Sequence, residues 1–230
     1  MKKNILMIGG SKGIGLAIAK QLSQEHTLYI ASRDLGDLDE LRVHHIPFDV
    51  TKDDLAPTLL PDELHGFVYL PGSISLKPFK MLDTDTFYKD MELNFFGLVK
   101  VIKNIIHKMA EGASMVFFSS VAVKIGMPFH TSVAASKGAI EGFAKSLAAE
   151  YAPKIRVNVI APSLTDTPLA SRLLSNDKKR ELMANRHPLK KIGSPLDMAN
   201  IAVFLLSDEN AWMSGQVIGV DGGLSTLNVT

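Results

Sequence analysis

A glycine-rich turn between a short apolar run and an amphipathic stretch constrains the fold most. Residues Asn4 to Ile8 predict a buried strand, and apolar residues recur at helical spacing from Gly13 to Gln24. The residues that join the two segments are Gly9-Gly10-Ser11-Lys12-Gly13-Ile14-Gly15. Glycines at such a junction permit a tight turn, a close approach of backbone to phosphate, and close packing of helix on sheet. We therefore expect a dinucleotide to bind here through Gly9, Ser11, Lys12, Gly13, Ile14 and Gly15, with its pyrophosphate at the helix N-terminus.

Short apolar runs alternate with longer helical stretches along most of the chain, a pattern typical of βαβ units and a parallel sheet. The predicted strands are Asn4 to Ile8, Thr27 to Ala31, Val43 to Phe48, Gly66 to Leu70, Ser114 to Ser119, Arg156 to Ala161 and Gln216 to Val220. The predicted helices are Gly13 to Gln24, Thr84 to about Met109, Ala134 to Tyr151 and Pro195 to Leu206. The fold class is α/β: a doubly wound Rossmann fold with about seven parallel strands and helices on both faces. No repeat or linker divides the chain, so residues 1–230 are expected to form one domain.

Composition excludes several classes of function. The chain has no cysteine, which rules out disulfides, cysteine-bound zinc and thiolate nucleophiles and favours a cytoplasmic location. The formal net charge is +1, and no run of like charges predicts binding to nucleic acid or to a membrane surface. The uncharged stretches are too short for a membrane helix. His44 and His45 are adjacent on a strand and point to opposite faces, so no metal site is predicted.

The residues about 20 positions after the glycine turn indicate which dinucleotide binds. A chain that prefers NAD has an acidic residue there for the ribose 2′-hydroxyl, whereas this chain has Ala31-Ser32-Arg33. Arg33, together with Ser32 and Lys12, suits the 2′-phosphate of NADP(H), since guanidinium groups pair with phosphate oxygens. The alternative is that Lys12 and Arg33 are solvated surface charges, and the neighbouring Asp34 keeps that alternative open.

Several further motifs complete a pattern that covers the whole chain. They are the glycine spacing Gly9-x3-Gly13-x-Gly15, Asn94, Ser119-Ser120, Lys137, Arg156-Val157-Asn158 and Val220-Asp221-Gly222-Gly223. With these motifs the sequence resembles the short-chain dehydrogenase/reductase family. The resemblance implies catalytic roles for Asn94, Ser120 and Lys137, with Lys137 also binding the cofactor ribose. It implies further cofactor contacts from Asp49, Val50, Gly72, Pro162, Thr165 and Thr167, and assembly into a homodimer or homotetramer.

Val133 stands where the family has the tyrosine that supplies the proton, four residues before Lys137. Valine has no ionisable proton, and a positioned acid contributes roughly 10² to 10⁴-fold to such a step. His130, Tyr69 and Lys137 are alternative proton sources, although Tyr69 is expected to pack against the cofactor and His130 to lie in a loop. Pro162-Ser163 is a further departure, because the family usually has Pro-Gly.

The leading hypothesis is an NADP(H)-dependent oxidoreductase with altered proton transfer that acts on a small carbonyl, alcohol or activated alkene. Dienoyl-CoA reductases, which are similar to this family, lack the tyrosine and keep the lysine, which makes alkene reduction an open alternative. A non-catalytic NADP(H)-binding sensor or subunit partner is the rival hypothesis, motivated by Val133. Residues 163–193 are irregular, and we expect them to form a lid over a small-molecule substrate.

Overall fold

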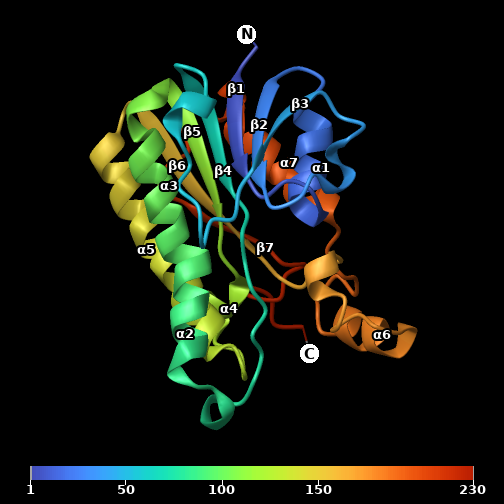
Figure 1. The fold of residues 1–230 in the computed structure, drawn as a ribbon. Coiled ribbons are helices and arrows are strands. Elements are labelled where there is room, and N and C mark those ends of the chain that lie inside the picture. The colour runs from blue at the N-terminus through green and yellow to red at the C-terminus, as the bar shows by residue number, and fades with distance from the viewer. Residues whose placement is uncertain (1, 230) are drawn as a thin grey trace.

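A computed structural model describes residues 2–229 and arranges them around one parallel sheet of seven strands (Figure 1). The strand order is β3-β2-β1-β4-β5-β6-β7. Strands β2 and β3 are added on one side of β1 and strands β4 to β7 on the other, so the order of the strands reverses between β1 and β4. The strands are β1 (Asn4–Ile8), β2 (Thr27–Ser32), β3 (Val43–Pro47), β4 (Leu64–Tyr69), β5 (Met109–Phe118), β6 (Ile155–Pro162) and β7 (Val217–Val220). This is the doubly wound Rossmann arrangement, in which ligands bind beyond the carboxyl ends of the strands where the order reverses.

Helices cover both faces of the sheet. The α-helices are α1 (Gly13–Leu22), α2 (Thr84–Met91), α3 (Gly97–Ile105), α4 (Val121–Ile125), α5 (Thr131–Tyr151), α6 (Asp177–Asn185) and α7 (Pro195–Leu206). Helices α1 and α7 pack side by side on one face, and α3 and α5 cover the other (Figure 1). Helix α6 stands apart on the segment after β6, near the carboxyl ends of the strands.

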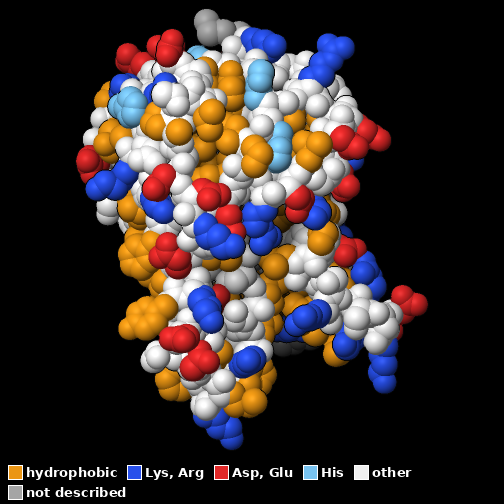
Figure 2. Space-filling view, viewed as in Figure 1, with side chains coloured by type: hydrophobic (Ala, Val, Ile, Leu, Met, Phe, Trp, Pro, Cys, Tyr) orange, Lys and Arg blue, Asp and Glu red, His pale blue; other side chains and the backbone are white. Residues whose placement is uncertain are grey.

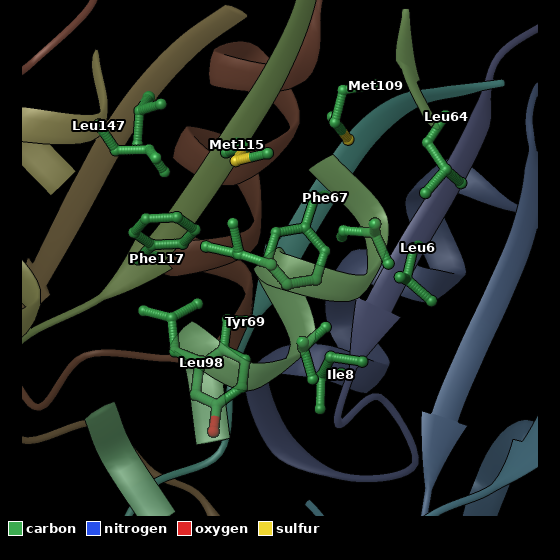
Figure 3. Packing of buried hydrophobic residues seen from close by; sticks show 14 of the residues in the cluster. Leu6, Ile8, Leu64, Phe67, Tyr69, Leu98, Met109, Met115, Phe117 and Leu147 are labelled. Carbon is green, nitrogen blue, oxygen red and sulfur yellow. The ribbon is translucent and has the colours of Figure 1, made fainter. Parts of the chain in front are cut away.

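The alternation of side chains along each strand builds the two cores. In β1, Leu6 and Ile8 point into the cluster under α3 and α5, whereas Ile5 and Met7 point into the cluster under α1 and α7. Figure 3 shows part of the first cluster, where aromatic side chains of β4 and β5 pack with aliphatic side chains around them. Because β1 lies mid-sheet and is buried on both faces, its sequence is continuously apolar.

The helix predicted from Thr84 to about Met109 is interrupted. Helix α2 ends at Met91, a π-helical turn spans Glu92–Phe96, and α3 then continues to Ile105. The Asn94 side chain explains the turn, since its Nδ2 donates to the Asp90 carbonyl oxygen at 2.8 Å and takes an acceptor of the helical ladder. Such π turns occur frequently at functional sites.

The predicted starts of one strand and one helix also differ from the structure by several residues. Strand β5 begins at Met109 rather than Ser114, because its first residues continue the pairing with β4 beyond a register shift. Helix α5 begins at Thr131 rather than Ala134, directly after the loop that contains His130. Within residues 2–229, no helix has both the length and the apolar character needed to cross a membrane.

Candidate active site

A cleft of about 1130 Å³ lies at the carboxyl ends of the strands. Figure 2 shows the molecule hollowed on this side, between the projection that carries α2 and the one that carries α6. The wall of the cleft contains all the residues predicted to bind the cofactor: Gly9, Ser11, Lys12, Gly13, Ile14, Gly15, Ser32, Arg33, Asp49, Val50, Gly72, Lys137, Pro162, Thr165 and Thr167. Segments far apart in the sequence therefore meet at one site.

The glycine turn has the backbone shape that a phosphate cradle needs. Gly9 and Gly13 adopt positive φ angles of 76° and 57°, which residues other than glycine rarely adopt. A Cβ atom added to Gly15 would lie 2.8 Å from the Gly9 carbonyl oxygen, so only glycine fits without moving the turn. No side chain of the described residues caps α1, which leaves its first N–H groups free to bind an anion. These features fit a dinucleotide pyrophosphate.

The end of β2 carries the groups predicted to distinguish NADP from NAD. The Lys12 ammonium lies 3.3 Å from the Asp34 carboxylate, and Arg33 is exposed at the rim of the cleft. Ser32 Oγ donates to the Asp34 carbonyl oxygen at 2.8 Å and therefore helps to hold this turn. Asp34 thus partly neutralises Lys12, whereas Arg33 has no acidic partner among the described residues.

Lys137 projects from α5 to the floor of the cleft. Its Nζ donates to the Phe118 carbonyl oxygen at 2.9 Å and lies 3.5 Å from the Pro71 carbonyl oxygen. Burial lowers the pKa of Lys137 to about 8, and the negative charge of Asp90 acts in the opposite direction. The Lys137 ammonium therefore loses its proton at a pH nearer to neutrality than an exposed lysine does.

Asn94 lies behind the cleft wall and is fully buried. Its Nδ2 donates to Ser73 Oγ at 3.1 Å, whereas its Oδ1 has no hydrogen-bond partner among residues 2–229. A Cβ atom added to Gly72 would lie 3.6 Å from this Oδ1 and 3.5 Å from Lys137 Nζ. The missing side chain of Gly72 therefore leaves room beside both atoms, and a water there would satisfy Asn94.

Asp90 is a buried carboxylate that sequence reasoning missed. It accepts hydrogen bonds from Ser73 Oγ and Ser132 Oγ, each at 2.6 Å, and from Ser75 Oγ at 3.3 Å. These contacts tie the loop after β4 to the start of α5, where Val133 lines the cleft with 6% of its surface exposed. Only its position four residues before Asn94, on one helix face, could have drawn attention to it.

Ser120 stands at the N-terminus of α4 and lines the cleft. Its Oγ accepts a hydrogen bond from the Ala122 N–H at 3.2 Å. Because the oxygen acts as the acceptor in this contact, the hydroxyl proton remains available to a group in the cleft.

The expectation that Tyr69 packs against the cofactor is wrong. Its ring is 1% exposed and belongs to the core (Figure 3), because the alternation along β4 directs it toward α3. Its hydroxyl donates to the Leu93 carbonyl oxygen at 2.6 Å, and burial raises the pKa of Tyr69 well above its ordinary value. His130 lies in a loop as expected, with its Nδ1 2.7 Å from the Pro128 carbonyl oxygen, and it lines the cleft.

The segment 163–193 forms one wall of the cleft and closes on itself at its base. The Gly193 N–H donates to the Leu164 carbonyl oxygen at 3.1 Å, and the Asp166 N–H donates to the Gly193 carbonyl oxygen at 2.8 Å. Within the segment, an ion pair joins Asp166 to Arg180 of α6. Across residues 2–229, no three His, Asp or Glu side chains group as a metal site would.

Comparison with known proteins identifies the family. A family model described as Enoyl-(Acyl carrier protein) reductase matches residues 9–225. A 3-oxoacyl-(acyl-carrier-protein) reductase of Chlamydia muridarum is 31% identical over 246 residues, which cover 98% of this chain and 98% of that protein. A short chain dehydrogenase family protein of Francisella tularensis has a similar structure, with 29% identity, a TM-score of 0.91, and coverage of 99% of this chain and 100% of that chain. The structure of ElxO with NADP bound is 27% identical, with a TM-score of 0.88 and coverage of 99% and 100%. The chain belongs to the short-chain dehydrogenase/reductase family of oxidoreductases.

Proposed function

We propose that the protein is an NADP(H)-dependent oxidoreductase that acts on a small carbonyl or alcohol or an activated alkene, with a proton route that does not use a tyrosine. The observation that carries the proposal is the cleft itself, whose lining brings together the glycine turn, Arg33, Ser120 and Lys137. A similar structure with NADP bound supports the choice of a nicotinamide cofactor. The exposed Arg33 supports the choice of NADP(H), because its guanidinium can pair with the 2′-phosphate.

Each group has a role that follows from its place in the cleft. The bound cofactor supplies or accepts the hydride. The glycine turn binds the pyrophosphate of the cofactor. Asp49 accepts a hydrogen bond from the adenine of the cofactor. Hydrogen bonds from Thr51 lower the pKa of Asp49 and so keep this carboxylate ionised. Lys137 binds the ribose, while Ser120 donates its hydroxyl proton to the substrate oxygen. Asn94 Oδ1 holds a water beside Lys137, which gives the buried lysine a path for protons.

The test is NADPH oxidation by the wild type, Val133→Tyr and Lys137→Ala across aldehydes, ketones, quinones and enoyl thioesters. We expect steady wild-type turnover that falls in Lys137→Ala, and the responding acceptor identifies the substrate class. Binding of NADPH without turnover on any acceptor would contradict the proposed activity.

A non-catalytic NADP(H)-binding role is the second candidate, and the valine at position 133 is the observation that favours it. The relatives are named as reductases, which does not favour this role. Activity that appears only in Val133→Tyr would mean a competent scaffold whose natural form lacks an acid, and would support the binding role instead.

We also propose that the protein assembles as a homodimer or homotetramer through its long helices. Phe96 in the π turn is half exposed and contacts Phe95, which packs against Phe143 of α5. Phe95 and Phe143 are partly buried against the core, whereas Phe96 stays exposed, and a second copy would cover Phe96. Sedimentation of the wild type and Phe96→Lys checks the proposal, since the charged variant is expected to dissociate.

A further inference from the structure

A hydrogen bond between Ser163 and His187 in the cleft wall has no role in the reaction described above. Ser163 follows β6, and His187 follows α6. Ser163 Oγ lies 2.8 Å from His187 Nε2, both residues line the cleft, and His187 is 4% exposed. Ser163 is also the residue that replaces the glycine of the family's Pro-Gly pair. A side chain is therefore present where the family usually has none.

The second ring nitrogen of His187 determines the direction of this hydrogen bond. Nδ1 lies 2.9 Å from the Met183 carbonyl oxygen, which can only accept, so Nδ1 carries the hydrogen. In the neutral ring Nε2 then carries the lone pair and accepts the Ser163 hydroxyl proton. A hydroxyl bound to a base that is itself oriented by a third group is the arrangement that moves protons in many enzymes.

The sheet places Ser163 beside the predicted substrate site. Strands β5 and β6 are parallel neighbours in which Phe118 pairs with Ile160, and the Ser119 N–H donates to the Ile160 carbonyl oxygen at 2.8 Å. Ser120 follows the carboxyl end of β5, and Ser163 follows the carboxyl end of β6. The two hydroxyls therefore belong to adjacent strand ends on the same cleft.

We propose that Ser163 and His187 relay the proton of the substrate oxygen in place of the missing tyrosine. The inference rests on the proposed function and narrows its substrate class to an alcohol and its carbonyl product. In the oxidation, the alcohol O–H proton passes to Ser163 Oγ while the Ser163 hydroxyl proton passes to His187 Nε2. The alcohol C–H pair leaves as hydride to the oxidised nicotinamide, and the O–H pair becomes the second bond of the carbonyl. The imidazolium returns one proton to water, and reduction follows the reverse sequence.

The first test measures turnover of NADP(H) with the best alcohol or carbonyl from the acceptor panel. We expect Ser163→Ala and His187→Gln to lower kcat by at least about 100-fold, the size of a lost acid–base contribution. The dissociation constant for NADPH should stay within about twofold, because neither side chain is proposed to bind the cofactor. Ser163→Thr keeps the hydroxyl and should retain activity. His187→Gly should regain activity with added imidazole, which a purely structural histidine would not do. His107→Gln, at an exposed position two residues after the end of α3, is the matched control.

The second test uses the cofactor-free protein. Nitrogen-15 NMR of the His187 ring should find the neutral form protonated at Nδ1, and Ser163→Ala should shift the Nε2 resonance. A ring protonated at Nε2, or kcat values within threefold of the wild type in both variants, would overturn the inference and leave the proposed function standing. Absence of wild-type turnover on the whole panel would instead refute the proposed function, and the relay with it.

Discussion

The buried ammonium of Lys137 makes folding stability depend on pH in a way that a single substitution can expose. Burial lowers the pKa of Lys137 from 10.5 to about 8, whereas the unfolded chain returns the group to its ordinary value. Between these two values the unfolded state binds a proton that the folded state has released, so stability rises with pH in that window. Stability from this group is complete above the unfolded pKa and is lost as the pH falls through the folded pKa.

The magnitude follows from the difference between the two pKa values. Each unit corresponds to about 1.4 kcal/mol, so the full difference amounts to about 3 kcal/mol, of which about 2.5 kcal/mol is gained between about pH 7 and about pH 10. Lys137→Met keeps the length of the side chain without the charge. We expect the free energy of unfolding of the wild type to gain about 2.5 kcal/mol more than that of Lys137→Met over this range.

Urea unfolding of both proteins at several pH values measures this difference. Other groups that titrate in the range contribute to both profiles and cancel in the comparison. Lys145→Met, at an exposed position on the same helix, is the matched control and should follow the wild type. Parallel profiles for the wild type and Lys137→Met would refute the reasoning, because they would mean that the lysine keeps its ordinary pKa in the folded protein.

Three other substitutions test the cofactor site and the buried carboxylate. Arg33→Asp should shift the ratio of NADPH to NADH affinity toward NADH by at least tenfold, about 1.4 kcal/mol, and unchanged relative affinities in calorimetric titrations would show that Arg33 does not contact the phosphate. Gly15→Ala places a Cβ 2.8 Å from backbone and should cost about 1 to 3 kcal/mol of stability and most of the NADPH affinity, measured by unfolding and titration. Gly142→Ala, where no atom lies within 4 Å of the added Cβ, should be neutral or stabilising. Asp90→Asn should lower the free energy of unfolding in urea by about 2 to 4 kcal/mol, because three hydroxyl donors lose a charged acceptor. The same substitution should lower the pKa of Lys137 further, because the negative charge of Asp90 raises that pKa. A loss of stability below about 1 kcal/mol would contradict the proposed role of Asp90.

The features that the sequence determined by itself are those that depend on local backbone geometry and on periodicity. The glycine turn needs positive φ angles and close backbone packing, so its residue types are restricted at each position. Strands β1 and β5 contain the continuous apolar runs Ile5 to Ile8 and Met115 to Phe118, because central strands of a parallel sheet are buried on both faces. The position of Asn94 in a helix was predictable, but the π turn was not, since it depends on one side-chain hydrogen bond.

Only the tertiary structure decided which polar groups meet at the cleft. Asp90 bonds to Ser73 and Ser132, which are 17 and 42 positions away, and Ser163 bonds to His187, which is 24 positions away. The placement of Tyr69 in the core, away from the cleft, was decided in the same way, by the face of β4 from which it projects. Burial of Lys137, and with it the lowered pKa, requires that α5, the end of β5 and the loop after β4 come together. Desolvation and hydrogen bonding depend on neighbours in space, and no periodicity along the chain specifies those neighbours.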